Sequence, residues 1–553
     1  MSATRLAAVA LAATGALACT IGPASLASRQ QPAWSEASSA TKHVIGVRVR
    51  DGAGELFDRR TKKAFVVRGT NYLRLDDAPK DPLDALLDPR ASNLTGIRSD
   101  FRTLRGLGFN TVRIFLDLCR IECIGDRSGL NPRYLDKLAR VLRVAKQEHL
   151  LLLPTLNEWD GFVGYRSAIP RATFAGSFNG LYLTSEGIKA TSRFFTDVIR
   201  GLQKRKAPLE AVLAWELRNE QFFDYTNVPF TRTSGRVRTA NGKTYDLADP
   251  AAKLRLMDDG IRTYVARVRA AIRKADPGVL VTMGFFNPQP ASDPRIVRTA
   301  PLLARSALDF FDFHYYPGGS ITLAQAVRDF GMAGRARKPI VLGEYGAFKF
   351  AYPSPDEGAA ALVDLQVQSC AAGFDGWLYW LETPQDRELW TGGAAGAAIR
   401  IAMSPQARPD PCVFGATTVR NLAQGKPVRA SRSVPSSPPE HAVDGDAESI
   451  WTAGEDAPQW IEIDLGSPSS VTKIALSVSQ YPEGQTRHRV LGRAPGGDDI
   501  LLHEFSGQTK DPEWLEFSPP QPWTNVRHIR VETVSSPSWV AWREIRVLGT
   551  SAG

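Results

Sequence analysis

The chain has 553 residues, of which 43% are hydrophobic and 23% are charged. This balance is typical of folded globular domains and excludes a disordered chain, a collagen-like rod and a coiled coil. The net charge is +10, from 68 lysines and arginines against 58 aspartates and glutamates. Because the positive excess is scattered rather than gathered in one tract, we expect general surface charge and no nucleic-acid partner.

The first 27 residues are predicted to direct export. Arg5 is followed by LAAVALAATGALA, an apolar run of 13 residues. Such a run is too short to span a bilayer and is typical of a signal peptide. Small residues offer cleavage sites after Ala18 and after Ala27. Cleavage after Ala18 would leave Cys19 first, as in a bacterial lipoprotein, so lipid anchoring at Cys19 and free secretion both stay open.

The protein is therefore expected to be secreted or extracytoplasmic, with the membrane as a partner only through Cys19. The polar residues 28–42 would form a tether. No run of 18 apolar residues follows the N-terminal segment, so no later spanning helix is expected.

Four further cysteines agree with an oxidising compartment. Cys119 and Cys123 could close a short loop, and Cys370 could hold Cys412 together with the chain around it. Four unpaired, mostly buried thiols are the alternative. No histidine lies near the first pair, which argues against a zinc site.

From residue 65, short β-branched runs alternate with amphipathic helical stretches. We expect strands at 65–71, 111–116, 151–156, 211–217, 279–285, 308–314, 339–345 and 376–381. Eight strand–helix units in about 340 residues predict a (β/α)8 TIM barrel over 43–403. A doubly wound open sheet is the alternative. Such a sheet usually has a glycine-rich phosphate loop after its first strand, and the sequence GTNYLRL at this place is not of that kind.

Residues 404–420 are rich in proline and lack periodicity, which indicates a linker. Short alternating segments follow, such as QWIEIDLG (459–466) and EIRVLG (544–549), separated by proline, glycine, serine and aspartate. They predict an all-β sandwich over 421–553. Because few periodic apolar residues cross the linker, we expect the two domains to share little core.

Polar residues collect where the predicted strands end, which is where barrels of this kind carry their working residues. The fourth strand runs into Asn219 and Glu220, and the seventh ends with Glu344. Two glutamates on opposite sides of one rim are what glycoside hydrolysis requires, one as a protonated acid and one as an ionised nucleophile or base. One such glutamate alone could be a solvated loop charge, but Arg113 and His314 on other strands make a joint pattern that favours function.

These residues lie in motifs that resemble clan A glycoside hydrolases, most closely family 5, the cellulase and β-mannanase group. The motifs are GTNY (69–72), GFNTVRIF (108–115), AWELRNE (214–220), FHYYP (313–317) and VLGEYG (341–346). The resemblance covers residues 44–403. Gln221 follows Glu220 where the family often has proline, which changes the shape of a loop rather than the chemistry.

The resemblance implies roles for the matching residues. Glu220 would be the acid/base and Glu344 the nucleophile. Asn219 would hydrogen-bond the 2-hydroxyl of the reacting sugar. Arg113 would steady the nucleophile carboxylate, and a nearby arginine lowers the pKa of a carboxyl in any case. His314 would orient the acid or the substrate.

Aromatic residues complete the expected site. Tyr316 would donate a hydrogen bond to the nucleophile, and Trp380 would form the floor on which the sugar stacks. Aromatic faces suit the C–H face of a pyranose, while amides suit its hydroxyls. The stretch NEWDGFVGY (157–165) is similar to a mannanase loop, so Asn157 and Trp159 are candidate substrate contacts.

The C-terminal part resembles the discoidin, or coagulation factor 5/8 type C, fold. Its carbohydrate-binding members form binding-module family 32. The motifs are NLAQGKPVRAS (421–431), HAVDGDAESIW (441–451), QWIEIDLG (459–466), VRHIRV (526–531) and WREIRVLG (542–549). Arg487, His488 and Trp539 are conceivable sugar contacts, and Trp539 and Trp542 could equally belong to the core.

The same resemblance implies a structural Ca²⁺ at Asp444, Asp446, Ser449 and Glu544. Clustered carboxylate and hydroxyl oxygens suit a hard cation, although Ser449 stands where threonine is usual. The alternative is a turn with a solvated acidic rim.

Together these features predict an exported, retaining β-glycoside hydrolase with a carbohydrate-binding module. Its partner would be a polysaccharide or oligosaccharide, with β-mannan or β-glucan as the substrate class, and catalysis would need no cofactor. One alternative is a catalytically idle barrel that serves as a lectin or adhesin. Another is an exo-acting β-glycosidase, if the insertion at 221–250 walls off one end of the groove.

Overall fold

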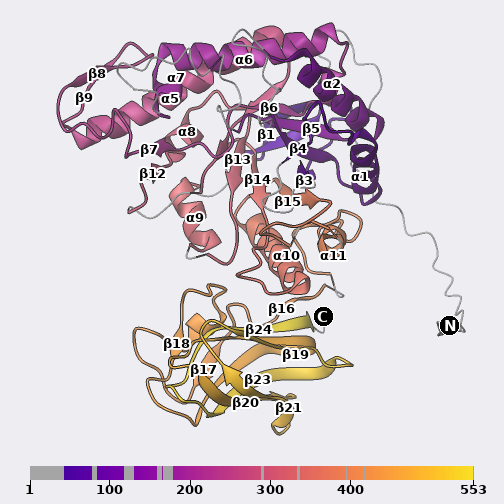
Figure 1. Ribbon diagram of the computed structural model, residues 1–553, viewed down its shortest axis with the longest axis vertical. Coiled ribbons are helices and arrows are strands. Elements are labelled where there is room, and N and C mark those ends of the chain that lie inside the picture. Colours follow the sequence, from indigo (N-terminus) through magenta and orange to yellow (C-terminus); the bar gives the residue numbers. More distant parts are fainter. Residues whose placement is uncertain are drawn as a thin grey trace, which may run out of the picture.

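The computed structural model describes residues 43–76, 84–116, 130–157, 165, 178–287, 292–319, 321–332, 337–390, 392–393, 395–415 and 418–551. The expected signal peptide and tether, the pair Cys119 and Cys123, and Trp159 lie outside the described residues. Within this part of the chain, no helix is both long and apolar enough to cross a bilayer. An α/β domain comes first and an all-β domain follows, and Figure 1 shows one above the other.

A parallel sheet forms the centre of the first domain. Its strands are β3 (Val67–Arg74), β4 (Thr111–Phe115), β5 (Leu151–Thr155), β6 (Ala214–Glu216), β10 (Leu280–Thr282), β11 (Gly284–Phe285), β13 (Phe311–His314), β14 (Ile340–Tyr345) and β15 (Gly376–Thr383). The order is β10-β6-β5-β4-β3-β15-β14-β13-β11. β10 and β11 are the two halves of one extended stretch that is interrupted at Met283. β10 pairs with β6, and β11 pairs with β13.

This connection nearly closes the sheet into a barrel, whereas a doubly wound sheet would leave two free edges. Each expected strand overlaps one or two of the observed strands, and β3 and β15 run past the expected ends at 71 and 381. A helix follows each strand in turn, so the topology is compatible with a TIM barrel. The helices are α1 (Leu94–Gly106), α2 (Pro132–Gln147), α5 (Gly180–Leu183), α6 (Ser185–Lys204), α7 (Pro250–Ala275), α8 (Ala300–Ala304), α9 (Leu323–Phe330), α10 (Pro355–Ala371) and α11 (Ala395–Ala402).

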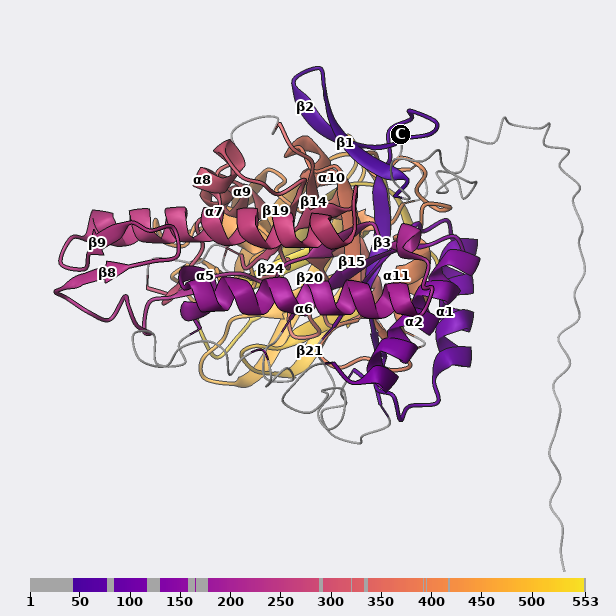
Figure 2. The same cartoon turned by 90° about the horizontal axis from the view of Figure 1, so that it is seen from above.

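Local sequence explains where these helices begin. The side chain of Thr184 accepts a hydrogen bond from the backbone N–H of Gly187 at the start of α6. Asp249 caps α7 in the same way, and Pro250 follows at the first helical position. Such caps satisfy N–H groups that have no partner within the helix. Figure 2 shows α6 and α7 lying side by side along one face of the barrel.

The barrel interior is layered. Side chains alternate across a strand, so Leu151 and Leu153 point inward while Leu152 packs against the helices. Toward the N-terminal ends of the strands the interior is apolar, and a hairpin of β1 (Ile45–Arg50) and β2 (Ala53–Asp58) packs on it through Ile45 and Leu56. This arrangement leaves the inward positions at the C-terminal ends for polar residues.

The insertion at 221–250 contains β7 (Phe223–Asp224) and a hairpin of β8 (Arg236–Arg238) and β9 (Thr244–Asp246). β7 pairs with β12 (Arg295–Ile296). The hairpin packs against α7, where the Tyr245 hydroxyl donates to Asp259 at 2.9 Å. In Figure 2 the hairpin projects at the far end of α6 and α7, away from the barrel strands. It therefore extends the rim outward.

The second domain is an antiparallel sandwich, as expected. Its strands are β16 (Arg420–Asn421), β17 (Val428–Ala430), β18 (Trp451–Thr452), β19 (Gln459–Val478), β20 (Gly484–Arg493), β21 (Ile500–Thr509), β22 (Trp514–Phe517), β23 (Trp523–Ser535) and β24 (Ala541–Ser551). The long strand β19 pairs with both β23 and β24 through shifts of register, which let one strand serve both neighbours. Trp451 and Trp542 lie in the core.

The predicted linker lies on the barrel. Nη2 of Arg68 donates to the carbonyl of Arg408 at 3.1 Å, and Nε of Arg408 donates to Gln366 at the same distance. A disulfide joins Cys370 to Cys412, with Cα atoms 5.5 Å apart. This pairing confirms one of the two cysteine alternatives for that pair.

The apolar cores of the two domains are separate clusters, but the domains also meet in a buried polar interface that the sequence did not predict. Glu357 of α10 accepts hydrogen bonds from Arg546 at 3.0 Å, and Lys473 lies 2.9 Å from its other oxygen. Lys473 also donates to Ser354 at 2.8 Å, and the Arg546 guanidinium lies over the Tyr352 ring at 4.4 Å. The interface is polar and ionic, which is why apolar periodicity did not reveal it.

Candidate active site

Arg113 of β4 lies at the centre of the polar layer and is completely buried. Its guanidinium donates to both carboxylate oxygens of Glu216, at 2.8 and 2.7 Å. It also donates to Glu344 at 2.6 Å, to Asn219 at 2.6 Å and to Asn71 at 2.7 Å. One cation thus orders side chains from β3, β6, β14 and the segment after β6.

Glu344, the expected nucleophile, has three partners, one on β4, one on β13 and one just after β13. Besides Arg113, the Tyr316 hydroxyl donates to its Oε2 at 3.0 Å, and Nδ1 of His314 lies 3.4 Å from that oxygen. Burial raises the pKa of Glu344, while His314 and Arg113 oppose the rise. Burial also raises the pKa of Tyr316 well above its usual value, so this hydroxyl remains a donor.

Glu220, the expected acid/base, is more open. About a third of its side chain is exposed, and its Oε1 lies 3.2 Å from Nδ1 of His314. Its backbone φ is +46°, a left-handed conformation that is strained for a residue with a side chain. One carboxylate oxygen of Glu220 lies within 4.8 Å of one oxygen of Glu344. The two expected catalytic groups therefore face each other across the mouth.

His314 links the two glutamates. Burial disfavours its protonation, but the carboxylates of Glu344 and Asp312 outweigh this and raise its pKa to about 10. His314 is therefore a second cation in the layer. Both cations lie among carboxylates, which balances the buried charge.

Two buried acids were not identified from the sequence. Burial raises the pKa of Glu216 to about 7, against the opposing effect of Arg113. Asp312 is also buried and lies 3.5 Å from Arg113, and Gly343 leaves space for it, since a Cβ there would meet its Oδ1 at 1.5 Å. The sequence did contain a signal for these two acids. A carboxylate on a strand that is otherwise apolar is costly to bury unless a cation lies opposite it, so each of them indicated a charged partner.

The amides of the site form a short chain. Asn219 accepts from Arg113 and donates from Nδ2 to Oδ1 of Asn157 at 2.9 Å. This bond uses one of the two N–H groups that the side-chain amide of Asn219 carries. Asn157 therefore joins the site through Asn219.

Trp380 lies at the rim. Its ring is half-buried and packs against Phe115 with ring centres 5.7 Å apart. Its indole N–H donates to Glu382 at 3.2 Å. The apolar side chains of Leu73 and Leu75 complete this small cluster.

The expected calcium residues lie on one loop and one strand of the sandwich. Ser449 donates to Oδ2 of Asp444 at 2.9 Å, and the N–H of Asp446 donates to Oδ1 of Asp444 at 2.8 Å. Glu544 is completely buried and accepts from the N–H of Gly445 at 3.2 Å. Its Oε1 has no hydrogen-bond partner among the described residues.

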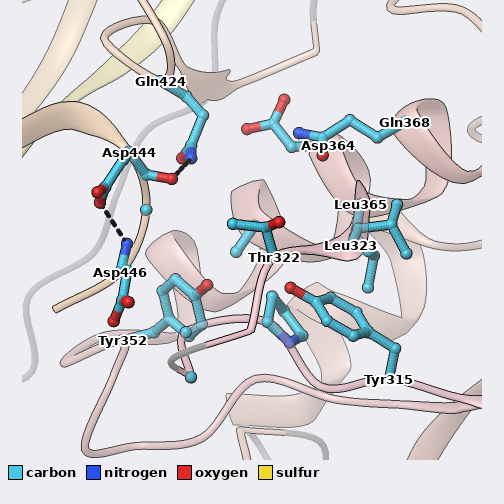
Figure 3. A pocket seen from close by; sticks show the side chains of 15 residues that line it. Tyr315, Thr322, Leu323, Tyr352, Asp364, Leu365, Gln368, Gln424, Asp444 and Asp446 are labelled. Carbon is cyan, nitrogen blue, oxygen red and sulfur yellow. Dashed lines mark hydrogen bonds between the residues drawn. The ribbon is translucent and has the colours of Figure 1, made fainter. Parts of the chain in front are cut away.

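This loop faces the barrel. Asp444 and Asp446 line a cavity of about 90 Å³ together with Tyr315, Thr322 and Tyr352 of the barrel. Figure 3 shows Asp444 and Asp446 with Tyr352 drawn next to Asp446, and Tyr315 farther from them. The implied ion site therefore lies beside the domain interface.

The three conceivable sugar contacts of the sandwich differ in burial. His488 is buried, hydrogen-bonded to Thr533 at 3.0 Å and packed edge-on against Trp542, so it belongs to the core. Burial lowers the pKa of His488 to about 4. Arg487 pairs with Glu504 at 2.9 Å. Trp539 is 56% exposed and remains a candidate contact.

Comparison with known proteins identifies the second domain. Residues 427–545 match the F5/8 type C domain family. The C-terminal part of the chain is accordingly an F5/8 type C domain. None of the curated proteins compared with the chain matches it.

Solved structures of single modules align with about a quarter of the chain. A family 32 carbohydrate-binding module from C. perfringens NanJ, in complex with galactose, is 17% identical, covers 24% of this chain and 98% of its own, and has a TM-score of 0.22. A Streptococcus pneumoniae fucose-binding module is 19% identical, covers 23% and 96%, and has a TM-score of 0.20. A chitosan-binding module of a Paenibacillus sp. chitosanase/glucanase is 23% identical, covers 24% and 99%, and has a TM-score of 0.21.

Proposed function

We propose that the chain is a retaining β-glycoside hydrolase that cleaves a β-linked polysaccharide, with β-mannan or β-glucan as the substrate class. The observation that carries this proposal is the approach of Glu220 and Glu344 to within 4.8 Å, oxygen to oxygen. Retaining enzymes place their carboxyl groups roughly 5–5.5 Å apart and inverting enzymes about 6.5–9.5 Å. An approach this close supports the retaining route, in which no water molecule stands between the second carboxylate and the sugar.

In this mechanism Glu344 attacks the anomeric carbon while Glu220 gives its proton to the departing glycosidic oxygen. The bond to the leaving group breaks and a covalent glycosyl-enzyme forms. Glu220 then takes a proton from water, which attacks the same carbon and releases Glu344. Arg113 and Tyr316 hold the Glu344 carboxylate in place through both steps.

Two variants test these roles. Glu344→Ala should abolish turnover, and azide should then give a product of inverted configuration. Glu220→Ala should spare the first step for substrates with good leaving groups, and azide should rescue it with retained configuration. An inverted product from the unaltered protein would overturn the nucleophile assignment.

Catalysis in this proposal needs no cofactor, since the Arg113 guanidinium supplies the positive charge beside the nucleophile. A structural Ca²⁺ is proposed for the sandwich instead. The residues fit such an ion for two reasons. The buried Oε1 of Glu544 has no hydrogen-bond partner among the described residues. The carboxylate of Asp444 lies on the loop that contacts Glu544. Asp444, Asp446, Ser449 and Glu544 would hold it.

The F5/8 type C domain is proposed to bind carbohydrate and to hold the barrel near its substrate. The family match and the exposed rings of Trp539 and Tyr481 support this role. The competing function is a glycan-binding lectin or adhesin with an idle barrel, which the same domain favours. Sugar release from mannan, cellulose, β-1,3-glucan and xylan, with sizing of the products, separates the two and also distinguishes endo from exo action.

Export is proposed on two grounds. The N-terminal apolar run is typical of a signal peptide, and the disulfide between Cys370 and Cys412 agrees with an oxidising compartment. Mass determination of the mature protein tests the cleavage site and lipidation at Cys19.

A further inference from the structure

We infer that the loop after β14 forms an outer subsite, in which the phenyl ring of Phe350 stacks on a sugar unit of the substrate chain beyond the reacting unit. This inference rests on the proposed function, because the occupant is a part of the same glycan. It adds a specific statement about the ligand, which must be a chain that extends along this side of the mouth.

A row of aromatic rings leads outward from the nucleophile. The Tyr316 hydroxyl bonds Glu344 at 3.0 Å. The Tyr316 ring lies 5.2 Å from the ring of Phe348, at an angle of 40°, and Phe348 lies 5.2 Å from Phe350, nearly parallel at 25°. The last ring of the row is therefore connected to the reacting centre by continuous contact.

Exposure increases along this row. Tyr316 and Phe348 are half-buried, whereas Phe350 is 72% exposed. Burying an apolar ring is favourable, and this ring keeps most of its surface in water in the free protein. A single exposed ring needs no explanation by itself. A ring that continues an aromatic row out of a sugar site has the position and chemistry of a stacking platform.

The loop that carries Phe350 is held firmly. The N–H of Lys349 donates to the carbonyl of Glu388 at 2.9 Å, and its ammonium group lies over the Trp390 ring at 4.9 Å. The N–H groups of Ala351 and Tyr352 both donate to the carbonyl of Phe348, at 3.1 and 2.9 Å.

Beyond this turn, the ring of Tyr352 packs under the guanidinium of Arg546 in the sandwich. The platform is thus built before the ligand arrives, and binding pays little to order it. Because the ring lies outside the reacting centre, its contribution should appear only when the ligand is long enough to reach it.

The test is binding as a function of chain length, in the full chain with Glu344→Gln to stop turnover. Manno- and gluco-oligosaccharides of two to six β-1,4-linked units are titrated by calorimetry, with and without Phe350→Ala. The affinity of the parent should rise when one particular unit is added. Phe350→Ala should remove that rise, which amounts to about tenfold in Kd, and leave the shortest ligand unaffected.

Three further variants sharpen the result. Phe350→Trp should keep the rise because it keeps an aromatic face, and Phe350→Leu should lose it although it stays apolar. Ile401→Ala, which alters another exposed apolar residue at 57% exposure on α11, should change nothing. Equal affinities for the parent and Phe350→Ala at every length would overturn the inference, as would an equal loss at every length.

Failure of the proposed function has a different signature. If the unaltered protein releases no sugar and the Glu344→Gln parent binds none of the oligosaccharides, the hydrolase proposal and the outer subsite fall together. If sugar is released but Phe350→Ala binds as the parent does, the outer subsite alone is wrong.

Discussion

Arg546 of the sandwich donates a hydrogen bond from Nη1 to Oε2 of Glu357 in the barrel at 3.0 Å, and both side chains are almost completely buried. Lys473 lies 2.9 Å from the other oxygen of Glu357. Although burial opposes ionisation, hydrogen bonding with Glu516 and the two cations lower the pKa of Glu357. Charges removed from water must be paired, so neither domain is complete at this surface without the other.

Glu357→Gln should destabilise the whole chain. The change leaves Arg546 buried without its close counter-ion and Lys473 with Glu516 alone, at 3.2 Å. Breaking a buried pair in this way costs about 3–5 kcal/mol. The melting temperature of the full chain is the measurement. Glu455→Gln is the matched control, because its pair with Arg432 is exposed and worth less than about 1 kcal/mol.

Equal melting temperatures for the two variants would show that the interface carries no stability.

Because the interface is shared, a chain ended near Ile401 should lose activity on soluble oligosaccharides as well as on polymer. That outcome is the reverse of what independent domains would give.

Loss of the disulfide should destabilise the linker region. Cys370 and Cys412 are 42 residues apart, and the chain-entropy model gives about 4 kcal/mol for a loop of that length. Denaturant unfolding of the Cys370→Ser, Cys412→Ser double variant should show a loss of that order. A reductant should lower the stability of the unaltered protein to the level of the double variant. If a reductant still lowered the stability of the double variant, the stabilising disulfide would have to involve other cysteines.

Tyr316→Phe should move the acidic limb of the kcat/KM profile toward higher pH. The Tyr316 hydroxyl donates to Glu344 and so favours its ionised form. Its removal raises the pKa of Glu344 further, because the ionised form loses a hydrogen bond. Tyr315→Phe is the control, because that hydroxyl donates to the carbonyl of Ile321 at 2.9 Å and not to a glutamate. An unmoved limb in Tyr316→Phe would exclude Glu344 as the group that titrates.

Glu544 should make the stability of the calcium-free protein depend on pH. Burial raises its pKa from the usual 4.5 to about 8, with Arg546 opposing the rise. A carboxyl whose folded pKa is raised stabilises the fold fully below pH 4.5, and that stability is lost as the pH rises toward 8. Bound Ca²⁺ would restore it by compensating the ionised carboxylate.

Melting temperatures with chelator and with Ca²⁺, measured from pH 4.5 to 8, test this. The two curves should diverge as the pH rises, and Glu544→Gln should remove both the divergence and the loss. Identical curves with chelator and with Ca²⁺ would rule out the ion site.

Much of the candidate site could be predicted from the sequence because its signals are local. Short β-branched runs reveal the barrel strands, and Glu220 and Glu344 stand where two of them end. Arg113, His314 and Tyr316 are recognisable on the same basis. The partners of Arg113 were harder to predict, because Glu216 and Asp312 lie on strands whose spacing in the barrel depends on closure.

Other features were decided only by the tertiary structure. The contact between Arg546 and Glu357 joins residues 189 positions apart, and no period or motif in either segment points to the other. The exposed Trp539 and the buried His488 were equally plausible sugar contacts until the strands were paired. Local patterns determine which face of an element is apolar, whereas the pairing of charges depends on which surfaces meet. That is a property of the packed chain, because the cost of burying a charge is set by what lies opposite it.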